Sequence, residues 1–581
     1  MASQLRAEQK NVGEVFTKGK YLIPEYQRPY SWERDECRTL WENLCEFAFP
    51  NDNPKNFDKH KNVYFMGTIL TFFNEAEEFE VIDGQQRLVT FLLMLRAFYR
   101  ALANAQDDVS KNNRRKIEEC IWQLDDDDRP DKSDIKLKYE VIADEDAAEL
   151  KKIFETGSAS PKNKSDYAAN YRLFQRWVTD LNNEKPGYLT HLVRCILNNV
   201  VLLPIEADTQ NTALRIFTTL NDRGRQLSDS DIFKAQFYKF YLKQGSVAKN
   251  NFVQRWKTLA ELCKKNFNPR KGTHVDDLFR RYMYYAKTRQ AIEQDKRISD
   301  TFSDMRDFYA EDNYKLLRDE KTFADLEWLA NFWDDVAERS DRFPATVLKK
   351  LYVLSYSPYS LWGYVVSLYV MSNRDLDEEK FCAFLDKTTA MILMNAVLDL
   401  GKQNIRRPFV LEFKKIFHGE PLEFDKQFKR SEKILRGRLS EMVFSNAKPI
   451  TRAMLAWRTF SDPEQKLPPP DVKLEQEHIY AKKRHELHAL NNPDALEFLG
   501  NKALLEKGIN IDASANSFFD KKQIYLGKDS NGNFINDGTF NLELRNLAEN
   551  LNDFTENDII ERNEEIFKAF VDYLRENNLL A

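Results

Sequence analysis

The feature that most restricts the fold of this 581-residue chain is a long stretch with helical periodicity, from about residue 240 to 460. Trp, Phe, Tyr and Leu recur there at three- and four-residue spacing and glycines are few, which predicts amphipathic helices packed into a bundle. The whole chain exceeds what one ordinary core supports, so we expect two to four domains. The helical stretch therefore predicts a spacer between domains at the two ends.

Composition is that of an ordered protein rather than a disordered one. Hydrophobic residues make up 42% and charged residues 31%, with 18 Gly and 19 Pro, a balance that favours a helix-rich soluble fold. The net charge of −5 excludes a uniformly basic nucleic-acid binder, but local patches matter more than totals for phosphate contacts.

Targeting signals and cysteine usage point to the cytoplasm. Residues 1–15 lack the apolar stretch of a signal peptide and no uncharged apolar run of about 18 residues occurs, so no membrane anchor is expected. The six cysteines form no Cys-x-x-Cys pair. They are typical of reduced thiols, and structural zinc is not expected.

The first 240 residues alternate strand-like and helical runs. Residues 63–73 and 79–82 are rich in β-branched and aromatic side chains, and 74–78 between them suits a hairpin connection. A helix is predicted over 88–102, and a further strand over 199–205. Another helix is expected over 227–241, with Ser228 or Asp229 as its N-cap.

Three polar turns in this part, at 24–32, 83–87 and 221–224, each combine a turn former with an arginine. A strand that ends in Asp83-Gly84 and continues into a helix presents free backbone N–H groups, and Arg87 adds a positive fork, so the turn suits phosphate. Asp83 would hold a hydroxyl or a metal-bound water, Gln85 and Gln86 would position a water, and Arg87 would neutralise charge. The alternative is structural, because Asp-Gly is a frequent turn and Arg87 can simply pair with an acid. No Gly-x-x-x-x-Gly-Lys-Ser/Thr motif exists, which excludes a Walker-type ATPase.

Consecutive prolines mark a boundary near the C-terminal end. Pro463 and then 468–470 break the helical pattern and favour a stiff extended linker. We therefore expect three domains, 1–240, 241–465 and 466–581, in a mainly α chain with α+β end domains.

The last domain carries an ordered set of residues with the chemistry of a one-metal nuclease. Phosphodiester hydrolysis needs an activated water and stabilisation of charge at phosphorus. His478 is the expected general base, oriented by the side chain of Asn501. Glu477 and Asn510 offer hard oxygen ligands, which favour Mg²⁺ or Mn²⁺ over zinc, with Asn516 as the substitute for Asn510. Lys521 and Lys522 would hold the scissile strand through its phosphates.

Two considerations bear on this set. Neighbouring side chains in a strand point to opposite faces, so Glu477 and His478 face one metal only if the strand ends or bulges there. A lone Glu-His pair is also commonplace as a structural or surface feature. His485 and His488 are weaker candidates for the base.

Residues 474–526 resemble the C-terminal HNH domain of GmrSD-type, modification-dependent (type IV) restriction endonucleases. The resemblance rests on Glu477-His478-Ile479, on Leu499-Gly500-Asn501, and on the later Asn510, Asn516 and Lys521 or Lys522. It implies a ββα-metal nuclease fold. Tyr480-Ala481 stands where a proline often follows, and Lys502 where a smaller or apolar residue is common; these departures are expected at the turn and surface.

Residues 12–100 and 199–236 look like the N-terminal domain of the same family, on the intact 83–87 block, on 27–32, and on 221–224 with Asp231 and Lys234. The resemblance implies a ParB/sulfiredoxin-like fold that binds and hydrolyses NTP. The implied site comprises Asp83, Gly84, Gln85, Gln86, Arg87, Gln27, Arg28, Asn221 and Arg223.

The leading hypothesis is thus a phage-defence endonuclease in which an NTP-dependent sensor of modified double-stranded DNA controls Mg²⁺-dependent HNH cleavage, acting alone or as a homo-oligomer. One alternative is a catalytically inactive DNA-binding or NTP-sensing regulator. Another is an RNA or single-strand nuclease, since HNH chemistry does not itself distinguish the sugar.

Overall fold

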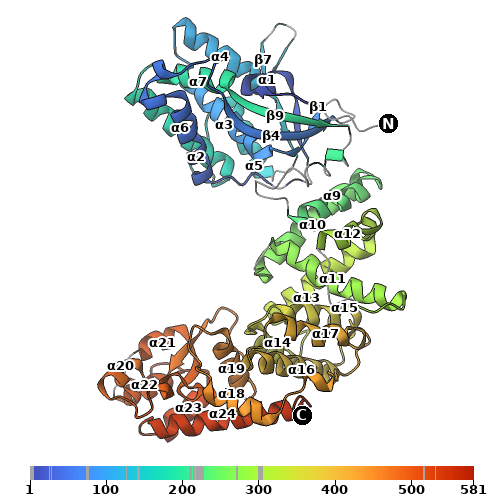
Figure 1. Ribbon diagram of the computed structural model, residues 1–581. Coiled ribbons are helices and arrows are strands. Elements are labelled where there is room, and N and C mark those ends of the chain that lie inside the picture. The colour runs from blue at the N-terminus through green and yellow to red at the C-terminus, as the bar shows by residue number, and fades with distance from the viewer. Residues whose placement is uncertain are drawn as a thin grey trace. The chain divides into compact units, whose positions relative to one another are not determined.

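The computed structural model describes residues 6–581 except 25–26, 28, 74–77, 126, 128, 141–143, 209–211, 214–215, 217–227, 270–271, 299–304, 515–516 and 530. The chain divides into two compact units, Met1–Val253 and Gln254–Ala581. Helices make up most of the chain, with one mixed sheet in the first unit (Figure 1).

The first unit is built on a seven-stranded mixed sheet of order β1-β9-β4-β5-β3-β8, with β2 paired to β9. β4 and β5 pair antiparallel, and β4 and β9 pair parallel. The predicted strands at 63–73, 79–82 and 199–205 are confirmed, whereas 74–77 of the predicted connection lie outside the described residues. The strands are β1 Arg6–Ala7, β2 Lys10–Asn11, β3 Tyr21–Ile23, β4 Tyr64–Phe73, β5 Phe79–Asp83, β8 Leu137–Tyr139 and β9 Val200–Ala207, and a separate hairpin joins β6 Trp122–Leu124 to β7 Pro130–Ile135.

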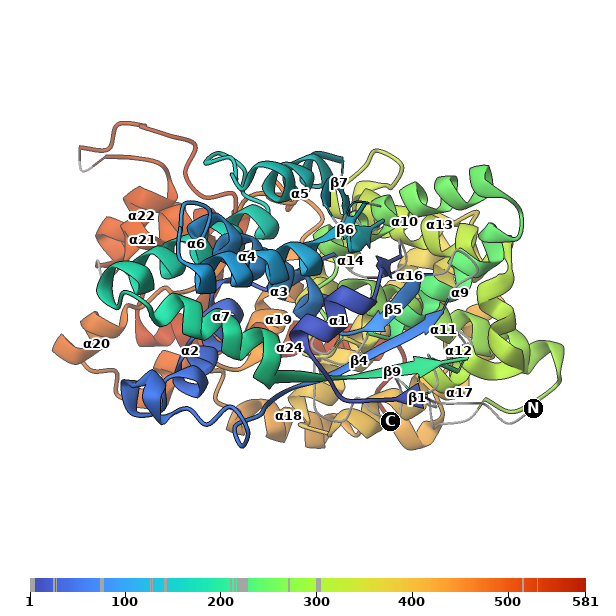
Figure 2. The ribbon, with the colours of Figure 1, turned by 90° about the horizontal axis from the view of Figure 1, so that it is seen from above.

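Helices pack against this sheet and enclose one apolar core. Figure 2 shows β9, β4 and β5 side by side, with α1 next to them. α3 is buried almost all round because its sequence from Leu88 to Phe98 is apolar apart from Thr90 and Arg96, which are also buried. The predicted helix at 88–102 is confirmed and begins earlier, at Gln85, and Ser228 is the N-cap of α9 through a capping box with Asp231. The helices are α1 Val12–Lys18, α2 Arg34–Ala48, α3 Gln85–Ala101, α4 Asp108–Ile121, α5 Asp144–Thr156, α6 Asp166–Glu184, α7 Tyr188–Asn199 and α9 Asp229–Leu242.

The expected helical region is confirmed. α10 crosses the boundary between the two units, and the helices that follow belong to the second unit. Aromatic side chains fill the spaces between these helices, as the three- and four-residue spacing predicts. They are α10 Ser246–Asn266, α11 His274–Glu293, α12 Met305–Tyr314, α13 Glu320–Ala337, α14 Ala345–Ser355, α15 Leu361–Ser372, α16 Glu378–Val397, α17 Lys402–Phe417, α18 Glu432–Glu441 and α19 Pro449–Phe460.

The nuclease-like segment forms an antiparallel hairpin followed by helices. β10 Leu474–His478 pairs with β11 Lys502–Glu506 in a straight register that sets Glu477 opposite Ala503 and His478 opposite Lys502. The short helix α20 and two 3₁₀ turns lie between the two strands, so the order of elements does not by itself establish the expected ββα-metal fold, which stays a prediction. The expected boundary at 465 lies within the second unit, where this segment packs with the preceding helices. The remaining elements are α20 Lys482–Leu487, α21 Lys507–Ala513, α22 Phe518–Tyr525, α23 Leu542–Asn550 and α24 Glu556–Glu576, with 3₁₀ turns η5 Pro493–Glu497 and η6 Leu499–Asn501.

Two further expectations concern the chain as a whole. All six cysteines are free, which fits the prediction of reduced thiols. In the part of the chain that the structure describes, none of the helices combines the length and the apolar character needed to cross a bilayer.

Candidate functional site

Glu477 and His478 send their side chains to opposite faces of β10. The β10–β11 register runs without a bulge, so the alternation of the strand is kept up to its last residue. The expected irregularity that would turn both side chains to one metal is absent from this hairpin, all of which lies within the described residues. Glu477 instead contacts the buried Lys521, and His478 contacts Glu497, which binds the buried Lys502.

Glu477 faces α22. Its Oε1 accepts hydrogen bonds from Lys521 Nζ at 2.5 Å and from the Tyr525 hydroxyl at 3.0 Å. Burial raises the pKa of the Glu477 carboxyl, and the nearby Lys521 ammonium opposes that rise. The pair joins the strand to α22 across 44 residues of sequence.

The lysines predicted to hold the DNA backbone are engaged inside the protein. Lys521 is fully buried and also donates to the carbonyl oxygen of His478 at 2.6 Å. Lys522 is half-buried and donates to the carbonyl oxygen of Leu551 at 2.8 Å. Lys521 therefore stabilises the hairpin, and in this arrangement its ammonium does not reach a phosphate at the surface.

His478 faces a carboxylate and two ammonium groups. Its Nε2 lies 3.3 Å from Oε1 of Glu497, the last residue of η5. Lys482 contacts the same oxygen at 3.2 Å, and Lys502 donates to the other carboxylate oxygen at 2.5 Å. The imidazole thus contacts the carboxylate of Glu497, and a lysine ammonium contacts each of the two carboxylate oxygens.

The imidazole is neutral at physiological pH. Burial, with the charges of Lys502 and Lys482, lowers the pKa of His478 to about 4, although Glu497 opposes the shift. Burial alone would raise the pKa of the Glu497 carboxyl, but its hydrogen bond and attraction to Lys502 lower it overall. Glu497 is therefore ionised next to an uncharged ring.

Lys502 is a correction to the sequence analysis, which placed it at the surface. Its side chain is fully buried, and its ammonium donates to Glu497, to the carbonyl oxygen of Phe444 at 2.6 Å and to Asn446 Oδ1 at 2.8 Å. Tyr480 and Ala481, also expected at a turn or the surface, are buried. The departures from the family pattern therefore lie inside the site.

Asn501 fixes the backbone that follows His478. Its Oδ1 accepts from the Tyr480 N–H at 2.7 Å, and its Nδ2 donates to the carbonyl oxygens of Tyr480 and Leu496. The Asn501 carbonyl also accepts from the N–H of Ile479. The side chain of Asn501 was expected to contact the imidazole directly. It instead orients the imidazole by fixing the main chain that follows His478.

The metal expected from the sequence does not fit this arrangement. Glu477 is paired with Lys521, and Asn510 donates to Glu475 at 3.1 Å while its Oδ1 is buried without a partner. Asn516 lies outside the described residues. Within the described parts of the chain, no three His, Cys, Asp or Glu side chains converge as a metal would require. The base candidate and the proposed ligands also lie on different faces of β10.

The turn 499–501 is held by the last helix. Arg562 Nη1 donates to the carbonyl oxygens of Leu499, Gly500 and Lys502 at 3.0, 2.7 and 2.8 Å. Asn563 accepts from the Gly500 N–H at 3.2 Å. The helix backbone packs so closely that a Cβ on residue 500 would lie 2.0 Å from the carbonyl oxygen of Ile559.

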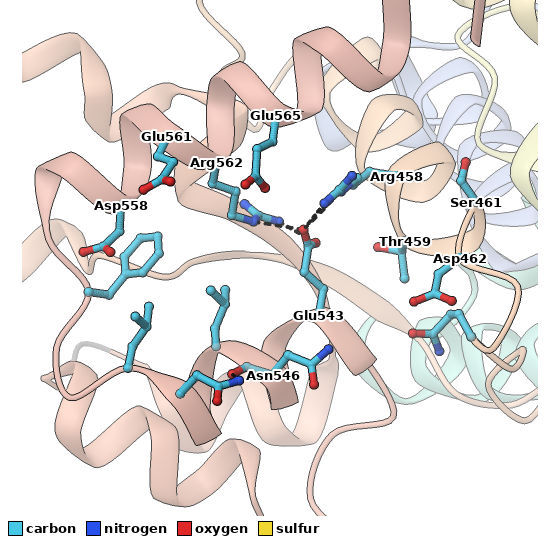
Figure 3. Close-up of a pocket in the computed structure, with 15 residues that line it drawn as sticks. Arg458, Thr459, Ser461, Asp462, Glu543, Asn546, Asp558, Glu561, Arg562 and Glu565 are labelled. Carbon is cyan, nitrogen blue, oxygen red and sulfur yellow. Dashed lines mark hydrogen bonds and ion pairs between the residues drawn. The ribbon is translucent and has the colours of Figure 1, made fainter. Parts of the chain in front are cut away.

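A cavity of about 560 Å³ is lined in part by Arg562. Figure 3 shows the guanidinium groups of Arg458 and Arg562 directed at the carboxylate of Glu543. Burial would raise the pKa of Glu543, but Arg562 and then Arg458 lower it to about 2. Asp558, Glu561 and Glu565 also line the cavity. This excess of carboxylates repels phosphate, so the cavity does not suit a nucleic-acid backbone.

Gln27 and Gln86 in the N-terminal unit join two segments of the chain through side-chain hydrogen bonds. Gln86 Oε1 accepts from the Ser31 N–H at 2.9 Å, and its Nε2 donates to the Pro29 carbonyl at 3.2 Å. Gln27 Nε2 donates to the carbonyl oxygens of Val81 and Ile82. Both side chains are buried, so these two predicted site residues connect 27–31 with 81–86.

Asp83 and Arg87 remain partly exposed at the start of α3. They form an ion pair of 3.4 Å, and Arg87 also donates to the Thr68 carbonyl at 2.6 Å. Gly84 is the N-cap with φ 96°, which leaves no side chain to occupy the first N–H groups of the helix. Gln85 is buried in the first turn, and predicted Arg28, Asn221 and Arg223 lie outside the described residues.

Sequence reasoning missed Glu497, Lys502 as an internal residue, and Arg562. Glu497 lies in a short 3₁₀ turn without periodicity, and Arg562 lies on an amphipathic helix where arginine is ordinary. No local sequence signal marks Lys502 as internal; its place opposite His478 follows only from the hairpin register that the structure shows.

The comparison with family models concerns the N-terminal part. Residues 12–238 match the family model for the GmrSD restriction endonuclease N-terminal domain. An uncharacterized protein of Methanocaldococcus jannaschii is 24% identical over 264 residues, which is 41% of this chain and 43% of the relative, so the chain matches less than half of that protein's length. The family match supports the predicted GmrSD-like character of residues 12–238.

Proposed function

We propose that this protein is a DNA endonuclease of the restriction type whose second unit cleaves the phosphodiester backbone with His478 as general base. The observation that carries the proposal is the contact between His478 and Glu497 at 3.3 Å, at the end of a hairpin in a chain whose first unit is GmrSD-like. A carboxylate beside a neutral imidazole is the arrangement that orients a base.

The chemistry begins with a water next to the imidazole. The ring takes a proton from this water as its oxygen attacks phosphorus. The bond to the departing sugar oxygen breaks, this oxygen takes a proton from solvent water, and the imidazolium then returns its proton to solvent. A bound phosphodiester brings negative charge that raises the pKa of His478 from about 4 toward neutrality, so the ring becomes a stronger base when substrate is present. Lys482, more than half exposed, is the cation available to contact a phosphate oxygen.

Dependence on Mg²⁺ or Mn²⁺ stays a prediction. Because the described residues do not gather into a divalent site, no step above depends on a metal. Cleavage measured with Mg²⁺, with Mn²⁺ and with EDTA decides whether an ion is needed.

The first unit is proposed to bind NTP and sense modified DNA. Its support is the family match, together with the absence of a side-chain cap at the N-terminus of α3 and the partly exposed Asp83 and Arg87. Backbone N–H groups and a guanidinium there suit a phosphate chain. Release of phosphate measures NTP hydrolysis. The molecular mass of the protein in solution shows whether it forms a homo-oligomer.

The deciding experiment compares modified and unmodified phage DNA, single strands and RNA, each with NTP and divalent ion. Cleavage of modified duplex DNA by the wild-type protein and none by His478→Ala is expected. Preferential cutting of RNA or single strands would replace DNA as the substrate. Equal results for wild type and His478→Ala would reject the assignment of the base.

One observation favours a second candidate, a DNA-binding or NTP-sensing regulator without cleavage. Glu477, the expected metal ligand, is already neutralised by Lys521. Binding of modified DNA without cutting under all divalent ions would select this regulator.

A further inference from the structure

We infer that Glu497, held in place by the buried Lys502, decides which imidazole nitrogen of His478 carries the proton. Its consequence for cleavage rests on the proposed function, whereas the position of the proton does not. Glu497 and Lys502 are thus positioning residues that act through His478.

The geometry assigns the proton to Nε2. An ionised carboxylate only accepts hydrogen bonds, so the nitrogen facing Glu497 Oε1 must be the donor. A neutral imidazole has one N–H, and Nδ1 therefore keeps the lone pair. Among the described residues, no hydrogen bond engages Nδ1, which leaves this nitrogen available to a water or a substrate.

Lys502 fixes the orientation of the carboxylate. Its ammonium is fully buried and has three protein acceptors, one of which is Glu497 Oε2 at 2.5 Å. A buried ammonium without its acceptors is strongly unfavourable, so Oε2 stays with Lys502 and Oε1 is directed to His478. Lys482 also contacts Oε1 but is more than half exposed and can turn to solvent.

The substitution Glu497→Gln tests whether Lys502 and His478 each bind a different oxygen of the Glu497 carboxylate. The amide has one oxygen and one NH₂ group, and the buried Lys502 requires the oxygen. The NH₂ group then faces His478, whose Nε2 must become an acceptor while its proton moves to Nδ1. The lone pair at Nδ1 is lost, as happens when an amide replaces the carboxylate partner of a catalytic histidine.

A double substitution should reverse the change. When Lys502→Met is added to Glu497→Gln, the buried ammonium that binds the amide oxygen is removed. The amide then turns, and its oxygen accepts hydrogen bonds from His478 Nε2 and from Lys482. The wild-type tautomer returns. Glu486→Gln, an exposed position on α20, is the matched control that changes an acid without touching the imidazole.

The readout is the ¹³Cδ2 chemical shift of histidine in the full-length, selectively labelled protein, with the His478 signal assigned by its loss in His478→Gln. Expected are Nε2–H for wild type and Glu486→Gln, Nδ1–H for Glu497→Gln, and Nε2–H again for the double variant. In cleavage assays Glu497→Gln should lower kcat by roughly 10²- to 10⁴-fold with KM unchanged, and the double variant should recover part of this loss.

An Nδ1–H wild-type protein overturns the inference directly, even if no variant folds. A wild-type tautomer in folded Glu497→Gln overturns it as well. If the tautomers follow the expected series but the wild-type protein cuts no substrate, the proposed function fails and the positioning role stands.

Discussion

Arg562, in the last helix, donates a hydrogen bond from its guanidinium Nη1 to the carbonyl oxygen of Gly500 at 2.7 Å. The same nitrogen reaches the carbonyl of Lys502, whose side chain holds Glu497 beside His478. Figure 1 shows this helix, α24, lying along α18 in the second unit. Changes near Arg562 therefore report on the framework of the site without touching the imidazole.

Gly500→Ala should destabilise the second unit by at least about 3 kcal/mol. The added Cβ would lie 2.0 Å from the Ile559 carbonyl oxygen and 2.8 Å from the Asn563 amide nitrogen, both main-chain atoms of α24 that cannot turn aside. Urea unfolding measures the loss. Gly508→Ala is the control, since its Cβ meets nothing within 4 Å, and it should leave stability unchanged or raise it by up to about 1 kcal/mol.

Glu543 should make the second unit sensitive to acid. Its pKa is about 2 in the folded chain against 4.5 when unpaired, so its stabilisation is complete above pH 4.5 and is lost as the pH falls toward 2. The shift corresponds to roughly 3 kcal/mol. Glu543→Gln should flatten stability over this pH range and lower it at pH 7, as chemical unfolding at several pH values will measure. An unchanged acid profile in the variant would contradict the assignment.

His478→Ala should abolish cleavage while the fold and NTP turnover stay intact. The side chain contributes the base and contacts Glu497, and without the imidazole Glu497 keeps its contacts with Lys502 and Lys482. Cleavage rates and thermal melting together separate lost chemistry from lost folding. His488→Ala is a suitable control because His488 is exposed and its hydrogen bonds are made by its backbone, whose carbonyl accepts from the Tyr480 hydroxyl and whose N–H donates to the Arg484 carbonyl; an equal loss there would count against His478.

Asp83→Asn and Arg87→Ala should impair NTP hydrolysis, with the melting temperature nearly kept for Asp83→Asn. Gln86→Ala should instead destabilise the first unit by about 1 to 3 kcal/mol, because the Ser31 N–H and the Pro29 carbonyl lose their partner. Phosphate release and calorimetry distinguish the two behaviours. Normal hydrolysis by purified Asp83→Asn would show that the N-terminal assignment is wrong.

Sequence patterns predicted the elements better than the contacts between them. The strands β4, β5 and β9 and the Ser228 cap follow from local periodicity and capping chemistry, which act over a few residues. The alternation along β10 required an irregularity for Glu477 and His478 to share one metal site, and the regular register shows that this expectation was wrong.

The partners of these side chains could not be predicted because they depend on tertiary packing. Lys521 meets Glu477 across 44 residues, and Arg562 reaches Gly500 across 62. Lysine is usually exposed, so nothing local marks Lys502 or Lys521 as buried. The predicted metal ligands shared a segment of sequence, but the register of one strand keeps them apart from the base.

Neighbouring positions 477 and 478 end at different internal groups, the ammonium of Lys521 and the carboxylate of Glu497, and this limits how the hairpin can change over evolutionary time. Inserting one residue between 474 and 477 would bring Glu477 next to Glu497, and deleting one would leave Lys521 opposite an imidazole. Length variation among descendants of this chain should therefore collect in the connections around the hairpin, and the strand itself should change only by substitution.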